Sequence, residues 1–274
     1  MSVSKIKSIV IVALLLINVF FLTVIVVDTI ADARSERLVI ENACAILRLG
    51  GIAVEPDSIR SIDALRTMRA VRDHEAEETI ARAVLGAVVM TDLGVIFRYE
   101  NPDNGVADFY SAGDFEIQIN EGVATNAWGT LRSVQRILSD MKLDTSEIVL
   151  SGEPGSEVVT AVAAYRGASI FNCAIEFVFS GVNLETVKGR YVTGIEAAED
   201  GAVISSPSAA LFDFLAAVRR GEAESTRIYS VESGYQFHHA GGSLGESLIM
   251  PAWLITADTG RYIIDSATGD IEPQ

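Results

Sequence analysis

Residues 73–119 read DHEAEETIARAVLGAVVMTDLGVIFRYENPDNGVADFYSAGDFEIQI, and this stretch decides the fold. A helix is predicted over Asp63–Leu85, in which Asp73 can cap the later half and acidic residues occupy the next turn. After Gly86 the pattern changes to short apolar runs separated by turns, and Asn104-Gly105 is a strong hairpin signal. The stretch therefore predicts a helix followed by antiparallel strands at Ala87–Met90, Val95–Tyr99, Val106–Tyr110 and Phe115–Ile119.

The same order recurs twice toward the carboxyl terminus. Helices are predicted at Leu131–Met141 and at Ser208–Arg220, where Gly221 ends the second one. Strands are predicted after each of these helices, at Glu147–Leu150, Val158–Tyr165, Ile170–Phe179, Thr186–Thr193, Arg227–Val231, Gly234–His238, Leu248–Thr256 and Arg261–Asp265. Helices followed by antiparallel meanders indicate an α+β fold in which each helix covers one face of a sheet.

The amino terminus carries an uncharged and almost wholly apolar run, Ser8–Val27. Its 20 residues match the ~20 that a helix needs to cross a hydrocarbon layer of ~30 Å. Lys5 and Lys7 precede the run, whereas acidic residues come directly after it, so the positive-inside bias places the amino terminus in the cytoplasm. We therefore expect a single-pass protein of the cell membrane with an extracytoplasmic carboxyl-terminal region.

A signal peptide is the alternative interpretation of this run, because Ala31-Asp32-Ala33 has the small-x-small form of a cleavage site. Secretory apolar cores are usually about 7–15 residues long, which favours an uncleaved anchor. Helix-compatible sequence continues as a stalk through Ala31–Leu49 to the stop at Gly50-Gly51. Its apolar stripe contains Val39, Ala43 and Ile46, with Ile40, Cys44 and Leu47 beside them, and a short strand is predicted at Ile52–Val54.

Three regions are predicted along the chain. Residues 1–30 form the cytoplasmic tip and the transmembrane helix, and residues 31–122 form a membrane-proximal α+β domain that includes the stalk. Residues 123–274 form a distal α+β domain of two helix-plus-meander units, and the boundary falls within Glu121–Ala127.

The composition excludes several partners and chemistries. The formal net charge of −16 disfavours nucleic acid and anionic headgroups. Two cysteines, Cys44 and Cys173, are too few for a disulfide framework, and both are predicted to be buried.

No catalytic, cofactor-binding or metal-ligating residues are predicted. His74 lies among acids at a helix start, which favours a solvated terminus over a cation site. His238 and His239 are adjacent on a strand and face opposite sides, so they are poorly placed to share a metal. Residues 241–245 match the G-x-S-x-G motif around Ser243, but no histidine follows Ser243 and the flanks predict strands, so a hairpin loop is favoured over a hydrolase elbow.

One polar residue of the apolar run points to a partner. Asn18 lies near the middle of Ser8–Val27, where an amide without a partner is costly. Such residues commonly bond to another membrane helix, although a bond within its own helix is the alternative. Asn18, Leu14 and Phe21 are therefore the predicted partner-binding residues.

Several segments together resemble the YycI/YycH-type regulatory proteins of Gram-positive bacteria. The anchor segments are Lys5-Ile-Lys-Ser-Ile and Leu14-Leu-Leu-Ile-Asn-Val-Phe-Phe-Leu22. Tyr99-Glu-Asn-Pro-Asp-Asn-Gly-Val-Ala-Asp-Phe109 is similar to the first hairpins of YycI proteins. Further similar segments are Gly113-Asp-Phe115, Ile170-Phe-Asn172, Leu184-Glu-Thr-Val-Lys-Gly-Arg190, Gly234-Tyr235, Pro251-Ala-Trp-Leu-Ile255, Thr259-Gly-Arg-Tyr262 and Ala267-Thr-Gly269.

The resemblance implies a function that the composition alone does not. It implies a non-enzymatic accessory protein of the WalK (YycG) sensor histidine kinase of cell-wall homeostasis, acting with a YycH-like co-regulator through membrane-helix and ectodomain contacts. An anchored extracytoplasmic module that binds peptides or wall fragments is the alternative, because exposed strand edges can accept an extended chain.

Overall fold

The computed structural model describes residues 34–62, 64–120, 129–198, 201–239 and 247–274. A helical segment over residues 34–49 comes first. The later helices are η1 (Pro56–Ser58), α2 (His74–Leu85), α3 (Thr130–Asp140) and α4 (Pro207–Arg220). The strands are β1 (Ile59–Arg60), β2 (Met68–Ala70), β3 (Val89–Asp92), β4 (Ile96–Asn101), β5 (Gly105–Tyr110), β6 (Asp114–Ile119), β7 (Thr145–Glu153), β8 (Ser156–Tyr165), β9 (Ala168–Ser180), β10 (Asn183–Arg190), β11 (Ile195–Ala197), β12 (Ile228–His239), β13 (Ser247–Ala257), β14 (Gly260–Asp265) and β15 (Ile271–Pro273).

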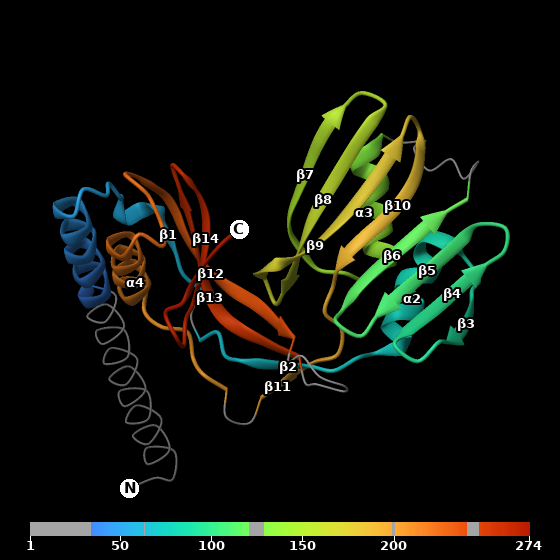
Figure 1. Cartoon of the computed structure of the whole chain (residues 1–274), viewed down its shortest axis with the longest axis horizontal. Helices are drawn as coiled ribbons and strands as arrows, with labels where there is room; N and C mark the ends of the chain where they lie inside the picture. The colour runs from blue at the N-terminus through green and yellow to red at the C-terminus, as the bar shows by residue number, and fades with distance from the viewer. Residues whose placement is uncertain (1–33, 63, 121–128, 199–200, 240–246) are drawn as a thin grey trace, which may run out of the picture.

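Hydrogen-bonded strands form one continuous path in the order β11-β2-β13-β12-β9-β10-β6-β5-β4-β3 (Figure 1). The hairpin β7–β8 joins this path at β9, and β14 and β15 join it at β13. Most pairings are antiparallel, whereas β1–β12 and β9–β12 are parallel. The predicted α+β class with antiparallel meanders is therefore confirmed.

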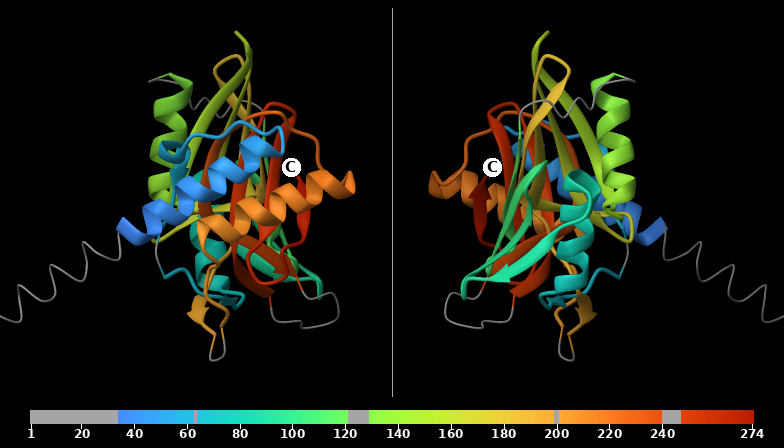
Figure 2. Two further views of the ribbon diagram at one scale, coloured as in Figure 1. Left: turned by 90° about the vertical axis from the view of Figure 1, so that its left-hand side faces the viewer. Right: turned by 90° about the vertical axis from the view of Figure 1, so that its right-hand side faces the viewer.

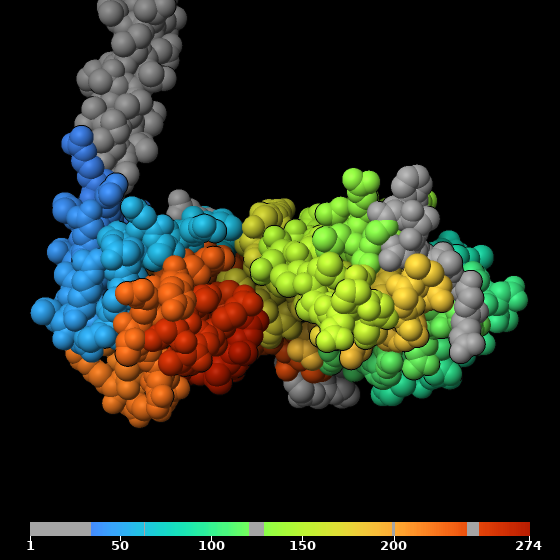
Figure 3. Space-filling model, turned by 90° about the horizontal axis from the view of Figure 1, so that it is seen from above, coloured from blue at the N-terminus to red at the C-terminus, as the bar shows by residue number. Residues whose placement is uncertain are grey.

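The helices cover the sheet in two places, and each place has its own hydrophobic core. One core lies between α2, α3 and strands β4–β6 and β8–β10, around Tyr99, Ile117, Val134 and Phe177. The other lies between the helical segment, α4 and strands β12–β14, around Leu47, Phe214 and Trp253. Figure 1 shows these as two lobes, and Figure 3 shows the narrower waist between them. Figure 2 (left) shows the helical segment and α4 side by side at one end of the molecule.

We call residues 73–193 the distal lobe, and residues 34–72 together with 194–274 the stalk lobe. The distal lobe is thus inserted into the stalk lobe, and the chain crosses between them twice. The predicted domain boundary at 122/123 lies outside the described residues, but Ile117 and Val134, which flank it, belong to one core.

A third cluster of apolar side chains joins the lobes. Strand β9 is 13 residues long, and its first part leaves the distal sheet to lie beside β12. Its residues Ile170 and Cys173 pack there with Tyr235, Phe237 and Ile249 of the stalk lobe. Gly234 permits this approach, because a Cβ at that position would lie 2.5 Å from the Phe171 ring and 2.6 Å from Ser169 O.

Local signals explain the helix ends. The Asp73 side chain accepts hydrogen bonds from the backbone of Glu75 and Ala76, which confirms the predicted cap of α2. Helix α4 begins with Ser206 as cap and ends at Gly221, whose positive φ suits a residue without a side chain.

The structure corrects four local predictions. Residues 64–73 are not helical, because Met68–Ala70 form β2 between β13 and β11. The two strands predicted around residue 232 form one continuous β12 against β13. Ile52–Val54 forms only an isolated bridge through Ala53. In the stalk, Val39 and Ile46 are exposed, whereas Ala43, Cys44 and Leu47 are buried.

No helix among the described residues is long and apolar enough to cross a membrane. The predicted anchor Ser8–Val27 lies outside them, so the anchor stays a prediction.

Candidate functional site

The junction between the two lobes is the candidate functional site, because both crossings of the chain meet there. The first crossing is residues 71–73 and the second is residues 191–194. Val71 N donates to Gly194 O at 3.0 Å, and Asp73 N donates to Thr193 Oγ1 at 3.2 Å. The two crossings are thus hydrogen-bonded to each other.

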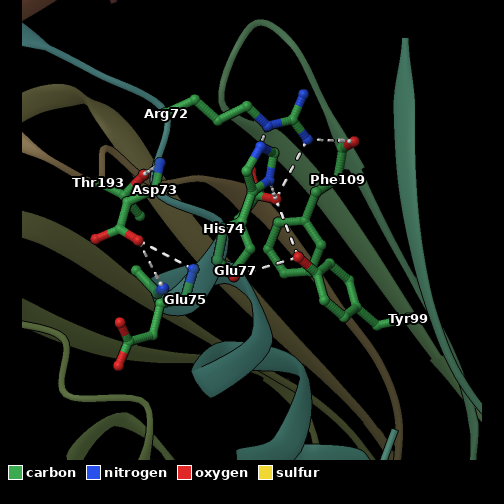
Figure 4. A network of polar contacts seen from close by, with 9 residues as sticks. Arg72, Asp73, His74, Glu75, Glu77, Tyr99, Phe109 and Thr193 are labelled. Carbon is green, nitrogen blue, oxygen red and sulfur yellow. Dashed lines mark hydrogen bonds and ion pairs between the residues drawn. The ribbon is translucent and has the colours of Figure 1, made fainter. Parts of the chain in front are cut away.

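A buried ion pair lies beside the first crossing (Figure 4). Arg72 Nε is 2.7 Å from Glu77 Oε1, and Arg72 Nη2 donates to Glu77 Oε2 at 3.3 Å and to Phe109 O at 3.1 Å. The guanidinium also lies 4.3 Å from the centre of the Phe97 ring. Only 7% of the Glu77 side chain is exposed, so water screens this pair far less than a surface pair. Arg72 thereby fastens the crossing to α2 and to β5.

Two further side chains complete this network. Tyr99 donates its hydroxyl to His74 O at 3.2 Å and lies 3.4 Å from Glu77 Oε2. Burial, and then the Glu77 charge, raise the pKa of Tyr99 to about 12, so its hydroxyl stays protonated. His74 is half exposed, with its Nδ1 3.2 Å from Glu77 Oε2 and its ring against Phe97. The predicted solvated terminus is thus only partly solvated.

A second ion pair lies on the distal side of the junction. Arg190 donates to both carboxylate oxygens of Asp114, at 2.9 and 3.0 Å, and this raises the pKa of Arg190. The same guanidinium lies 5.6 Å from the centre of the Phe237 ring of the stalk lobe. It therefore joins β6 and β10 to β12.

The amide of Asn172 links β9 to β12 in place of a regular ladder. Its Nδ2 donates to Phe237 O and its Oδ1 accepts from Phe237 N, both at 2.8 Å. The backbone of β9 pairs with β12 at a single position, Ile170 with Tyr235. One side chain thus satisfies both backbone groups of Phe237 where the two strands diverge.

A small cavity lies at the centre of the junction. Its volume is about 50 Å³, and residues of both lobes line it, among them Ala70, Arg72, Glu77, Asp114, Tyr191 and Phe237. This is the scale of about two water molecules, which is too small for a substrate or cofactor. A wider and more open hollow of about 490 Å³ adjoins the same crossings, lined among others by Asp73, Tyr165, Thr193 and Gly194. The hydrogen bonds and ion pairs of the junction are suited to fixing the relative orientation of the lobes.

Of the histidines that the sequence singled out, only His74 belongs to the junction network. Asn18, Leu14, Phe21 and Ser243 are outside the described residues. His238 Nε2 is 3.8 Å from Asp265 Oδ2, whereas His239 Nδ1 is 3.1 Å from Ser247 Oγ, so the two histidines have different partners. Within the described ranges, no group of three or more His, Cys, Asp or Glu side chains is arranged to hold a metal ion.

Sequence reasoning missed the residues of the junction. Arg72 belongs to no motif, and Asn172 was noted only within the segment Ile170-Phe-Asn172. The fold brings their partners to them. The only local signal was Asp73, because its role as a helix cap marks where the first crossing ends.

Comparisons with known proteins leave the family of this chain open. No family model matches it, and no curated protein matches it. An uncharacterized protein from Eubacterium rectale is similar in structure, with 9% identity over 78% of this chain and 86% of that one, at a TM-score of 0.48. The YpeB C-terminal domain of Bacillus megaterium is similar at 12% identity over 75% and 98% of the two chains, with a TM-score of 0.36. Scores under 0.5 do not establish a shared fold, so the resemblance to YycI-type proteins stays a prediction.

We expect both cysteines to be inert toward alkylating reagents in the folded protein. Cys44 and Cys173 are free and buried, as predicted. Burial raises the pKa of Cys44, and that of Cys173 to about 12, so little reactive thiolate forms at neutral pH. Mass spectrometry after maleimide treatment should find no adduct in buffer and two in urea. Fast labelling of Cys173 in buffer would show that the junction opens.

Proposed function

We propose that the chain is a membrane-anchored, non-enzymatic regulator of a sensor histidine kinase of the WalK (YycG) type, acting in cell-wall homeostasis with a YycH-like co-regulator. In this proposal the Asn18 face of the anchor contacts a kinase membrane helix and the extracytoplasmic lobes bias the conformation of the kinase. The segment resemblance is one support, and the attachment of the stalk is the other.

The observation that carries the proposal is the burial of one face of the helical segment 34–49 in the stalk lobe. Ala43, Cys44 and Leu47 are at most 1% exposed, and they pack with α4 and β12–β14. Arg48 Nη2 also donates to Val54 O at 2.8 Å, which holds the end of the segment. A helix fixed in this way turns with its lobe, so a change in the lobe reaches the preceding anchor as a rotation or tilt.

The junction fixes the distal lobe to the stalk lobe, and the stalk lobe holds the helical segment that follows the anchor. The Arg72 ion pair ties the first crossing to the distal lobe. Arg190 and the Asn172 amide tie β10 and β9 to β12 of the stalk lobe, so a partner bound to the distal lobe can act on the anchor. Such a regulator shifts a two-state kinase only by its different affinities for the two states. No chemical step in the chain is needed for this.

Replacing Asn18 with Leu should weaken association with the kinase, because the amide loses its partner in the other helix. The measurement is co-purification of the full chain with a WalK-type kinase from membranes. The matched control is Asn18→Leu combined with Leu16→Asn, which keeps the polarity but moves the amide roughly 160° around the helix. We expect weak association in both variants. Undiminished association and signalling in Asn18→Leu would refute the proposed contact.

One observation favours the alternative of a peptide-binding module. Strand β7 is exposed at seven of its nine positions, and in the described pairings its only neighbour is β8. Val149 and Leu150 are 45% and 43% exposed beside its free edge, which is the arrangement used for strand addition. Binding of extended wall peptides by soluble residues 31–274, with no change in kinase output when the gene is deleted, would favour this function.

A further inference from the structure

The helical segment 34–49 has a second apolar face, on the side away from its own lobe. Leu38, Val39, Ile46 and Leu49 are 59%, 49%, 43% and 90% exposed. Asn42, also exposed, lies among them. We call these five residues the outer seam.

The outer seam is continuous and uncharged. At about 100° per residue, its members fall within an arc of roughly 100° that also contains Ser35. The charged side chains of the segment lie on other sides of the helix, and several are paired within the chain. Arg37 Nε is 3.1 Å from Glu41 Oε1, and Arg48 Nη2 is 3.2 Å from Glu55 Oε2.

We propose that the outer seam binds the outer seam of a second copy of this chain, as a short parallel two-stranded coiled coil just outside the membrane. Val39, Asn42, Ile46 and Leu49 follow the alternating three- and four-residue spacing of such a seam. β-branched side chains alternate with Asn42 and Leu49, a pattern similar to that which favours two parallel strands. Across a two-fold axis, the Asn42 amide meets its own equivalent and gains a partner.

The identity of the occupant follows from charge and orientation. A seam without charges repels nothing in an identical copy. The neighbouring charges of Arg37, Glu41 and Arg48 are paired within the chain and offer little to a charged partner. The predicted anchor ends at Val27, seven residues before the described helix, so two copies in one membrane present their seams in parallel and at one height. The seam also lies at the end of the molecule opposite the distal lobe (Figure 3), where a second copy meets no obstruction from that lobe.

The outer seam is short, and its length determines whether two copies associate in a membrane or in dilute solution. Isolated helices under about 12–15 residues are marginal in water, but this one is already held by its own lobe. Anchoring in one membrane then raises the effective concentration of the second copy. We therefore expect dimers in membranes and few among dilute soluble molecules. This inference rests on the proposed anchor but not on kinase binding.

Disulfide cross-linking of the full chain in membranes tests the proposal. Ile46→Cys places a thiol in the seam, whereas Glu41→Cys places one on the same helix outside it. On a non-reducing gel, oxidised Ile46→Cys should shift from the 29.4 kDa monomer to twice that mass, and Glu41→Cys should stay monomeric. The native cysteines do not interfere because both are buried.

A second pair of variants distinguishes loss of the contact between two seams from unfolding of the protein. Val39→Cys should also cross-link, and adding Ile46→Glu should abolish this, because two like charges then face each other across the seam. Ile46 is exposed, so the fold survives the change, as continued protection of Cys44 from maleimide would confirm. Equal cross-linking of Ile46→Cys and Glu41→Cys, no dimer at all, or adducts only with a different protein would each overturn the proposal. Kinase co-purification of the same variants shows separately whether the proposed function stands.

Discussion

Replacing Glu77 with Gln should destabilise the protein by about 3 kcal/mol, the lower end of the range for removing one partner of a buried ion pair. The carboxylate is nearly buried and receives two bonds from Arg72, so its loss leaves an uncompensated charge at the junction. An exposed pair contributes about 0–1 kcal/mol. The size of the loss in stability therefore shows whether the Arg72–Glu77 pair behaves as a buried pair or as a surface pair.

Urea denaturation of soluble residues 31–274, monitored by circular dichroism, measures this effect as a shift in midpoint at constant slope. The control is Glu75→Gln in the same turn, where the side chain is exposed and the change should stay within about 0.5 kcal/mol. Replacing Arg72 and Glu77 together with Met should recover most of the stability, because no lone charge remains. A loss under about 1 kcal/mol for Glu77→Gln would mean that the pair behaves as a surface pair.

The second large effect is expected for Asn172→Ala. This change removes both partners of the Phe237 backbone, next to the single Ile170–Tyr235 pairing of β9 with β12. Each unpaired backbone group costs about 1–3 kcal/mol, so we expect a loss of about 2–6 kcal/mol for the two groups in the same denaturation experiment. The destabilisation should be concentrated at the junction rather than in either core.

Cysteine labelling shows whether that localisation is correct. Cys173 directly follows Asn172 in the sequence and packs into the junction, whereas Cys44 packs into the core of the stalk lobe. Asn172→Ala should therefore speed maleimide labelling of Cys173 more than that of Cys44. Glu176→Ala on the same strand removes only a half-exposed partner of Lys188, so it should leave the labelling rates of both cysteines unchanged. Equal acceleration at both cysteines would indicate global unfolding instead.

The features that sequence predicted well are those whose signals lie within a few residues. Asp73 caps α2, Gly221 ends α4, and Asn104-Gly105 forms the hairpin between β4 and β5. Each of these depends on local backbone chemistry, which the neighbouring residues determine. The class of the fold followed from the order of such elements.

The features that sequence missed depend on partners far along the chain. Met68–Ala70 forms a strand because residues 247–249 and 195–197 flank it, and nothing near it in sequence carries that information. The stalk has two apolar faces, so periodicity alone could not tell which one its lobe covers. Asn172 meets Phe237 across 65 positions, and so the candidate site at the junction was not predicted.

The insertion of the distal lobe into the stalk lobe has a consequence for the order in which the protein matures. All the core partners of the distal lobe are contiguous in sequence, whereas Ala43 of the stalk packs in a core with Trp253, 210 positions later. At ribosomal speeds that interval is roughly 10–40 s, during which the first helix has no core to enter. The part of the protein made first, next to the predicted anchor, is thus the last to fold. Loss of the carboxyl-terminal residues would accordingly reach the helix that is made first, because Ile271 packs against the same core as Ala43.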